Sequence, residues 1–153
     1  MKATKQNKRA DYRVSLSADT VVIAPDATTF VSRSIELHSP FSTYGFVITQ
    51  NPNSTQSNRS LELLLDKDIP SGEYPANGSG GLFHGFSYTV SNATPFFPSL
   101  ILYTAIDGVV KVEAHRDGAL EHFKIEFSVN VRSHEGETIP LTGHSEIFVK
   151  HHS

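Results

Sequence analysis

Histidine is the residue type in this sequence best suited to chemistry, because its imidazole titrates near neutral pH and ligates metals. The chain has eight histidines. His115 and His122 flank an Asp-Gly dipeptide at 117–118, which is typical of a tight turn between two strands. We therefore expect the two imidazoles to face each other across a hairpin, with Glu113 next to them. Two imidazoles and one carboxylate form a ligand set that zinc accepts, so His115 and His122 are candidate metal ligands.

Other chemistry is harder to build from this chain. There is no cysteine, which excludes disulfides, thiol catalysis and thiolate metal sites. The Gly-rich stretch 77–81 lacks the Lys-Ser/Thr pair that contacts phosphate and magnesium, and no serine lies in a Gly-x-Ser-x-Gly elbow. We therefore expect no cofactor and favour a protein that is not an enzyme. A small hydrolase or metal-dependent enzyme that uses histidines is the alternative.

Aromatic residues in loops indicate a binding surface. Tyr74, Phe96 and Phe97 all lie in segments that contain proline. A loop ring beside polar residues is typical of a sugar-binding or protein-binding patch. We take these three residues and His84 as candidate ligand contacts. The alternative is that Phe96 and Phe97 fold back and close the end of the β-domain.

Charge is distributed unevenly along the chain. Basic residues predominate in residues 1–13, whereas the rest is acidic, within a net charge of −3. We expect residues 1–11 to form a flexible basic arm, and nucleic-acid binding by the acidic body is disfavoured. A basic arm before a β-body resembles that of small jelly-roll capsid proteins. This resemblance implies a structural subunit as a further alternative.

The elements that must position these residues are β-strands. In the run 123–131 every second residue is apolar and the residues between are polar, a pattern typical of a half-buried strand. The segments 110–114 and 139–149 alternate in the same way. The runs are separated by Asp-Gly at 107–108 and 117–118 and by Glu-Gly at 135–136. Residues 99–150 thus predict a four-stranded antiparallel meander. Gly143, in the middle of its run, predicts a bulge or bend.

The first half of the chain is also β-like. It contains six candidate strands, at Tyr12–Leu16, Thr20–Ala24, Thr29–Leu37, Tyr44–Gln50, Ser60–Leu65 and Leu82–Val90. Nine or ten short strands in one chain predict an all-β, two-sheet antiparallel sandwich of jelly-roll type, with a closed barrel as the alternative. We expect a single domain over residues 12–150 and a disordered tail at 151–153.

These patterns together favour a non-catalytic β-sandwich module for binding or assembly, with a carbohydrate or a partner protein as ligand. Short stretches at 69–74 and 141–147 are similar to parts of small bacterial β-domains. Unpaired strand edges would allow a homodimer. The chain has no apolar run long enough to span a membrane and no apolar region after its charged start, so we expect a cytoplasmic protein.

Overall fold

The computed structural model describes residues 13–25, 29–38, 41–50, 57–92 and 99–152, and within these ranges it contains ten strands and no helix. The strands are β1 (Arg13–Ile23), β2 (Thr29–Ser32), β3 (Ser34–His38), β4 (Thr43–Thr49), β5 (Ser57–Asp66), β6 (Gly72–Pro75), β7 (Phe83–Asn92), β8 (Ser99–Asp117), β9 (Leu120–Ser133) and β10 (Thr138–His152). No helix in the described part of the chain has the length and apolar character needed to cross a membrane.

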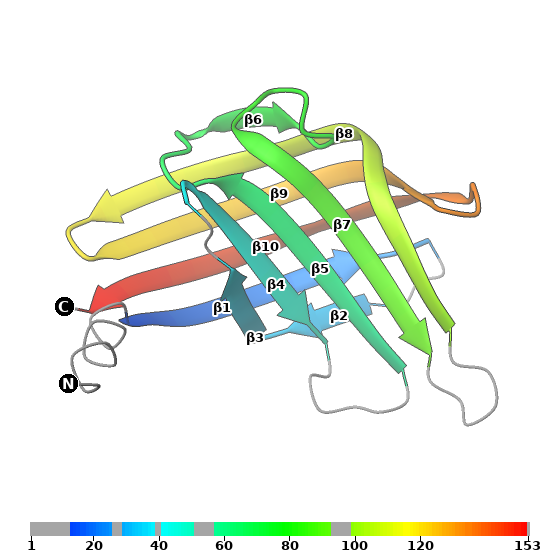
Figure 1. Ribbon diagram of the computed structural model, residues 1–153, viewed down its shortest axis with the longest axis horizontal. Coiled ribbons are helices and arrows are strands. Elements are labelled where there is room, and N and C mark those ends of the chain that lie inside the picture. The colour runs from blue at the N-terminus through cyan, green and yellow to red at the C-terminus, as the bar shows by residue number, and fades with distance from the viewer. Residues whose placement is uncertain (1–12, 26–28, 39–40, 51–56, 93–98, 153) are drawn as a thin grey trace, which may run out of the picture.

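All ten strands belong to one antiparallel sheet, which nearly closes on itself (Figure 1). The order is β2-β1-β10-β9-β8-β7-β5-β4-β3, and β6 pairs with β8 outside this path. The two end strands, β2 and β3, are consecutive in the chain and separated by Arg33 alone. The chain itself therefore joins the two ends of the sheet, and the Ser32 hydroxyl donates a 2.5 Å hydrogen bond to the Thr49 carbonyl at this junction. The all-β prediction is confirmed and the barrel alternative fits, whereas the two-sheet jelly roll is not confirmed.

The core lies between two opposing parts of this curved sheet. Phe46 on β4 packs against Phe123 on β9, with ring centroids 5.9 Å apart, and Phe86 on β7 packs against Phe127 on β9 at 4.9 Å. The predicted alternation along 123–131 is confirmed, because its apolar residues are all buried and Ser128 between them is exposed. Burial of one face of each strand thus explains the period of two in the sequence.

The C-terminal meander has three strands, β8, β9 and β10, where the sequence pattern predicts four. Asp107 and Gly108 lie inside the long strand β8, next to a register shift between Ala105 and Asp107. Gly108 has φ +109°, and a Cβ there would lie 2.5 Å from the Val129 Cα. The bulge falls at Ile106, which has no register partner, and the dipeptide beside it continues the strand instead of forming a hairpin turn. The turns at 117–118 and 135–136 are confirmed, with positive φ at both glycines.

Gly143 does not introduce a bulge, because the pairing of β10 with β9 and with β1 continues through it without a register shift. A Cβ at Gly143 would lie 2.8 Å from the Phe127 Cζ and would overlap the carbonyl oxygen of Val21 on β1. Glycine is thus required for the close approach of β1 and for the Phe127 ring that lies over it.

Several other predicted boundaries change. β1 is one continuous strand across the two predicted segments, and the predicted strand 29–37 divides at Arg33. β6 forms at Gly72–Pro75, where the sequence pattern predicts no strand. His151 and His152 belong to β10, opposite β1, where the sequence pattern predicts a disordered tail. The predicted basic arm at 1–11 lies outside the described residues.

Candidate ligand-binding site

A pocket lies at the end of the barrel where β9 ends and β10 begins. Its volume is about 290 Å³, and its lining residues come from β5, β7, β8, β10, the turn before β10 and the segment after β1. Mouths of β-barrels are common ligand sites, because the strands hold the walls rigidly while the barrel end gives access. This volume suits a small molecule and not a polymer chain.

One wall of the pocket is apolar. Val90 on β7 and Ile101 on β8 are direct cross-strand partners, and Ile139 on β10 completes the wall. All three are half-buried and pack against the core. Half-burial here means that a ligand would remove further apolar surface from water, which favours its binding by about 25 cal/mol for each Å² covered.

Polar residues line the pocket next to this wall, since Tyr103 lies two residues from Ile101 on β8 and Glu137 lies two residues before Ile139. The Tyr103 hydroxyl donates a 2.5 Å hydrogen bond to Glu137 Oε1. Glu137 lies in the β9–β10 turn, where its backbone N–H donates to the Ser133 hydroxyl at 3.1 Å and its carbonyl accepts from the Ser133 N–H at 2.8 Å. The turn thereby fixes the position of the carboxylate. Arg59 of β5, the register partner of Val90, also lines the pocket.

Burial, followed by the hydrogen bond to Glu137, raises the pKa of Tyr103 to about 12. The phenol therefore stays neutral near pH 7 and remains a hydrogen-bond donor to the carboxylate. The second carboxylate oxygen of Glu137 can still accept hydrogen bonds from a ligand. The Tyr88 ring packs beside the Tyr103 ring, with centroids 6.1 Å apart, and helps to hold it in position.

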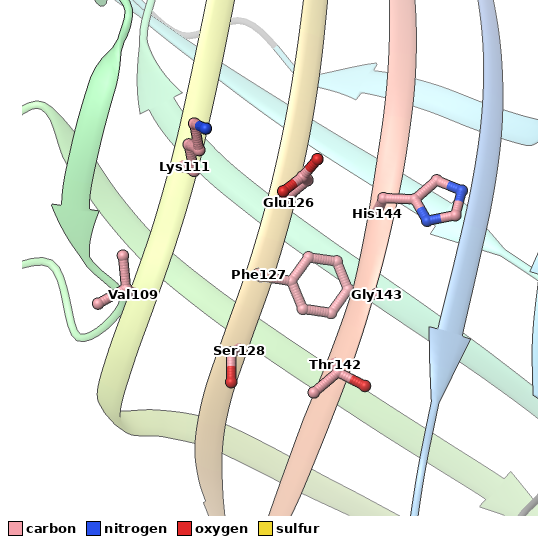
Figure 2. Close-up of a pocket in the computed structure, with 8 residues that line it drawn as sticks. All are labelled: Val109, Lys111, Glu126, Phe127, Ser128, Thr142, Gly143 and His144. Atoms are coloured by element: carbon pink, nitrogen blue, oxygen red, sulfur yellow. The ribbon is translucent and has the colours of Figure 1, made fainter.

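A second hollow, of about 370 Å³, lies on the outer surface of the sheet (Figure 2). Lys111, Glu126 and His144 form one row across β8, β9 and β10, because each is the register partner of the next. Figure 2 shows that the Phe127 ring extends toward Gly143 between this row and the smaller side chains of Ser128 and Thr142. The row is exposed to water, so its charges are screened and the hollow holds a ligand less firmly than the barrel end.

A buried carboxylate lies at the other end of the barrel. Glu121 on β9 accepts a hydrogen bond from the Tyr44 hydroxyl, lies 2.7 Å from the His151 Nε2 and accepts from the Arg116 Nε at 3.2 Å. Arg116 also donates to the carbonyls of Lys67 and Ile69, at 2.7 and 3.0 Å. Burial and the contact with Glu121 raise the pKa of Tyr44.

The Glu121 cluster is structural, because three protein groups already occupy its carboxylate oxygens. It joins β4, β8, β9 and β10 at one end of the barrel. Sequence reasoning missed this cluster, because Tyr44 and His151 are far from Glu121 in the chain. The only local signal was the opposite charges of Arg116 and Glu121 on either side of the turn.

The structure brings His115 and His122 together as the hairpin prediction requires. They are register partners with ring centroids 6.1 Å apart. The His122 ring stacks on Phe148 at 4.2 Å, and its Nε2 lies 3.5 Å from a carboxylate oxygen of Glu146. Glu113 pairs instead with Lys124 on β9. Among the described residues, no group of three or more His, Asp or Glu side chains is placed to hold a metal ion.

The other candidate contacts do not converge. Tyr74 on β6 packs against the core, and its hydroxyl donates to the Pro70 carbonyl at 2.5 Å. His84 on β7 is half-buried, and its Nε2 has no hydrogen-bond partner within the described ranges. Neither residue lines either hollow. Phe96 and Phe97 lie outside the described residues.

Comparison of this chain with protein-family models, with curated proteins and with solved structures returns no match. Its function must therefore be inferred from its own geometry.

Proposed function

We propose that this chain is a non-catalytic binding module, and that its ligand is a small amphipathic molecule held in the pocket at the Glu137 end of the barrel. The observation that carries the proposal is that three apolar residues, Val90, Ile101 and Ile139, line the same pocket as the hydrogen-bonded pair Tyr103 and Glu137. The matching ligand has an apolar body and one hydroxyl, amine or amide group that donates to the carboxylate.

The state of the polar groups favours binding over catalysis. A general base needs a free acceptor within reach of a substrate proton, and a nucleophile needs a base beside it. The Tyr103 phenol is held in its neutral form by a raised pKa, and its hydroxyl donates its one hydrogen bond to Glu137. The phenol is therefore better suited to orienting the carboxylate than to moving a proton, and the second Glu137 oxygen is left to accept from a ligand.

The aromatic geometry favours an amphipathic ligand over a carbohydrate. Sugar-binding sites present exposed ring faces, but Tyr88 is 2% exposed and Tyr103 is 5% exposed. Both rings are thus buried and leave little flat aromatic surface for stacking. Binding of a carbohydrate is a distinct outcome of the test.

The test fills the pocket from within. Ile101→Phe adds a ring to the apolar wall, whereas Leu102→Phe adds the same ring one residue away on the exposed face of β8, where Leu102 is 46% exposed. Indole and benzyl alcohol serve as amphipathic probes and glucose as the carbohydrate probe. Binding is followed by backbone amide chemical shifts in two-dimensional NMR spectra.

We expect indole or benzyl alcohol to shift the amides of Ile101, Tyr103 and Glu137, and we expect Ile101→Phe but not Leu102→Phe to abolish these shifts. Shifts caused by glucose alone, or by the probes on the outer face around Ser128, would overturn the amphipathic-ligand proposal. A pocket that responds to none of the three probes would also count against it.

A further inference from the structure

The first half of β1 presents a strand edge with which no neighbouring strand pairs. β10 pairs with β1 along its whole length on one side. On the other side, β2 pairs only with residues 20–23. Beyond Arg33, which forms an ion pair with Asp19, the chain continues as β3, which lies near β1 but pairs with β4 and not with β1. Figure 1 shows β3 running across the direction of β1. Among the described strands, residues 13–19 are the longest unpaired edge.

This edge lacks the usual protection against pairing. Natural edge strands are commonly blocked by proline, lysine or a bulge. The segment Arg-Val-Ser-Leu-Ser-Ala-Asp at 13–19 contains no proline and no lysine, and its pairing with β10 runs without a register shift. The N–H and C=O groups on its outer edge are therefore able to accept another strand.

The sequence of this edge is complementary to itself. When two copies are laid antiparallel with Leu16 opposite Leu16, Val14 comes opposite Ala18 and Ser15 comes opposite Ser17. The same register sets Arg13 of one copy opposite Asp19 of the other, and it does so twice about the two-fold axis. Apolar residues thus lie opposite apolar residues, serines lie opposite serines, and each charged residue lies opposite one of the other sign. Such pairs stabilise antiparallel strands.

The apolar residues of this edge lie on the inner face of the sheet and the polar ones on the outer face. Leu16 is half-buried and Ala18 is buried against the core, whereas Ser15, Ser17 and Asp19 are exposed on the outer face. In a dimer the apolar residues would continue the inner layer and the serines would continue the outer one. Asp19 is 71% exposed in spite of its ion pair with Arg33, so its carboxylate can take a second cation.

We propose that a second copy of this chain pairs with residues 13–19 of β1, antiparallel and centred on Leu16, so that the sheets of two barrels become continuous. The occupant is a second copy because the edge matches itself in side-chain type and in charge. This dimer is independent of the ligand proposal, since its test reads residues 13–19 and not the pocket at Glu137.

The decisive test uses the absence of cysteine from the chain. Ser15→Cys and Ser17→Cys are made in separate proteins, mixed and treated with oxidised glutathione, which takes up the two electrons when two thiols form a disulfide. Directly opposite residues of an antiparallel pair have Cβ atoms about 4.5–5.5 Å apart, close to disulfide geometry. Ser128→Cys on the exposed face of β9 is the control for random collision.

We expect the mixture to give a disulfide-linked dimer that joins one chain of each variant, in higher yield than either variant gives alone, and Ser128→Cys to give little. Equal cross-linking by Ser128→Cys, or a monomer by light scattering at high protein concentration, would overturn the proposal. A higher yield of cross-linked dimer from Ser15→Cys alone than from the mixture would show that the strands pair in a different register. It would overturn the register centred on Leu16.

A charge swap tests the same register without cysteine. Asp19→Arg is expected to raise the dimer dissociation constant about tenfold, because two attractive pairs become repulsive. Arg13→Asp combined with Asp19→Arg restores opposite charges and is expected to recover the dimer. Arg33→Ser, which leaves Asp19 unchanged, is the matched control. Failure of the double variant to recover association would rule out the Arg13–Asp19 pairing.

Discussion

The hydroxyl of Tyr44 on β4 donates a hydrogen bond to the carboxylate of Glu121 on β9, 77 positions further along the chain. The bond crosses the interior of the barrel and links two parts of the sheet that do not pair as strands. His151 and Arg116 bind the same carboxylate, so one buried acid connects the C-terminal strand, the β8–β9 hairpin and β4. A charge in this position is stable only while its partners are present.

Loss of this carboxylate should therefore weaken the fold. We expect Glu121→Ala to lower the free energy of unfolding by about 2–3 kcal/mol, because it removes hydrogen bonds to a charged group and leaves Arg116 without its ion pair. Glu126→Ala, on the exposed face of the same strand, should change it by less than about 0.5 kcal/mol. Urea denaturation of both variants is the measurement, and equal effects would contradict the structural role of Glu121.

Alkaline pH should destabilise the protein through Tyr103. The pKa of this phenol is raised from 10.0 to about 12 in the folded protein. A raised pKa means that the fold favours the neutral form, so this contribution to stability is complete below about pH 10 and is lost as the pH rises toward 12. Burial and the contact with Glu121 raise the pKa of Tyr44 in the same direction.

The measurement is the free energy of unfolding at a series of alkaline pH values, with the absorbance of ionised tyrosine recorded in parallel. We expect Tyr103→Phe to flatten the decline relative to the unmodified protein. A decline of the same steepness in the variant would show that Tyr103 does not cause it.

Phe127 and Ser128 are neighbours on β9 that should differ sharply in their effect on stability. Phe127 is 5% exposed and packs against Phe86, whereas Ser128 lies on the exposed face. We expect Phe127→Ala to cost about 3–5 kcal/mol through the cavity it leaves, and Ser128→Ala to cost less than about 0.5 kcal/mol. Stability is measured by thermal and chemical denaturation. Similar losses of stability in the two variants would mean that both faces of β9 are buried.

Phe127 also shows what could be predicted from the sequence. Burial of one face sets a period of two, and that period is visible in any strand whose faces differ, so the strands of the C-terminal half were predictable. The continuation of β8 through Asp107-Gly108 was not, because Gly108 has a positive φ inside the strand, as the glycine of a hairpin turn has. The sequence alone does not distinguish these two uses of glycine.

Closure of the sheet and the position of the pocket depend on contacts between distant residues. β2 and β3 lie at opposite ends of the strand order although only Arg33 separates them, and no local pattern records that arrangement. Tyr103 and Glu137 meet through the pairing of β8 with β9 and the turn that follows it, 34 positions apart. Pocket residues of this kind follow from strand register, which the sequence pattern does not fix.

Gly143 should tolerate no side chain. A Cβ there would overlap the Val21 carbonyl and press against the Phe127 ring, so β1 would have to move away from β10. We expect Gly143→Ala to lower the free energy of unfolding by about 1–3 kcal/mol. Gly85→Ala on β7, where a Cβ would meet nothing within 4 Å, is the control. Equal tolerance at the two positions in denaturation experiments would contradict the close packing of β1 on β10.

Removal of divalent metal should not destabilise the protein. We expect the melting temperature to stay unchanged after dialysis against a strong chelator, because a structural metal site needs three or four ligands held together. His115 and His122 supply two imidazoles 6.1 Å apart, and His122 is stacked on Phe148. Added zinc should therefore bind weakly at this pair, because two imidazoles leave its coordination incomplete.

His115→Ala should remove the zinc binding and leave the melting temperature unchanged, since His115 is exposed. The measurements are elemental analysis of freshly purified protein and thermal melts with and without chelator. Stoichiometric metal in the purified protein, together with a large fall in melting temperature on chelation, would show that the protein is a metalloprotein. That result would overturn the proposal of a metal-free binding module. Zinc binding that survives His115→Ala would place the metal at other residues of the chain.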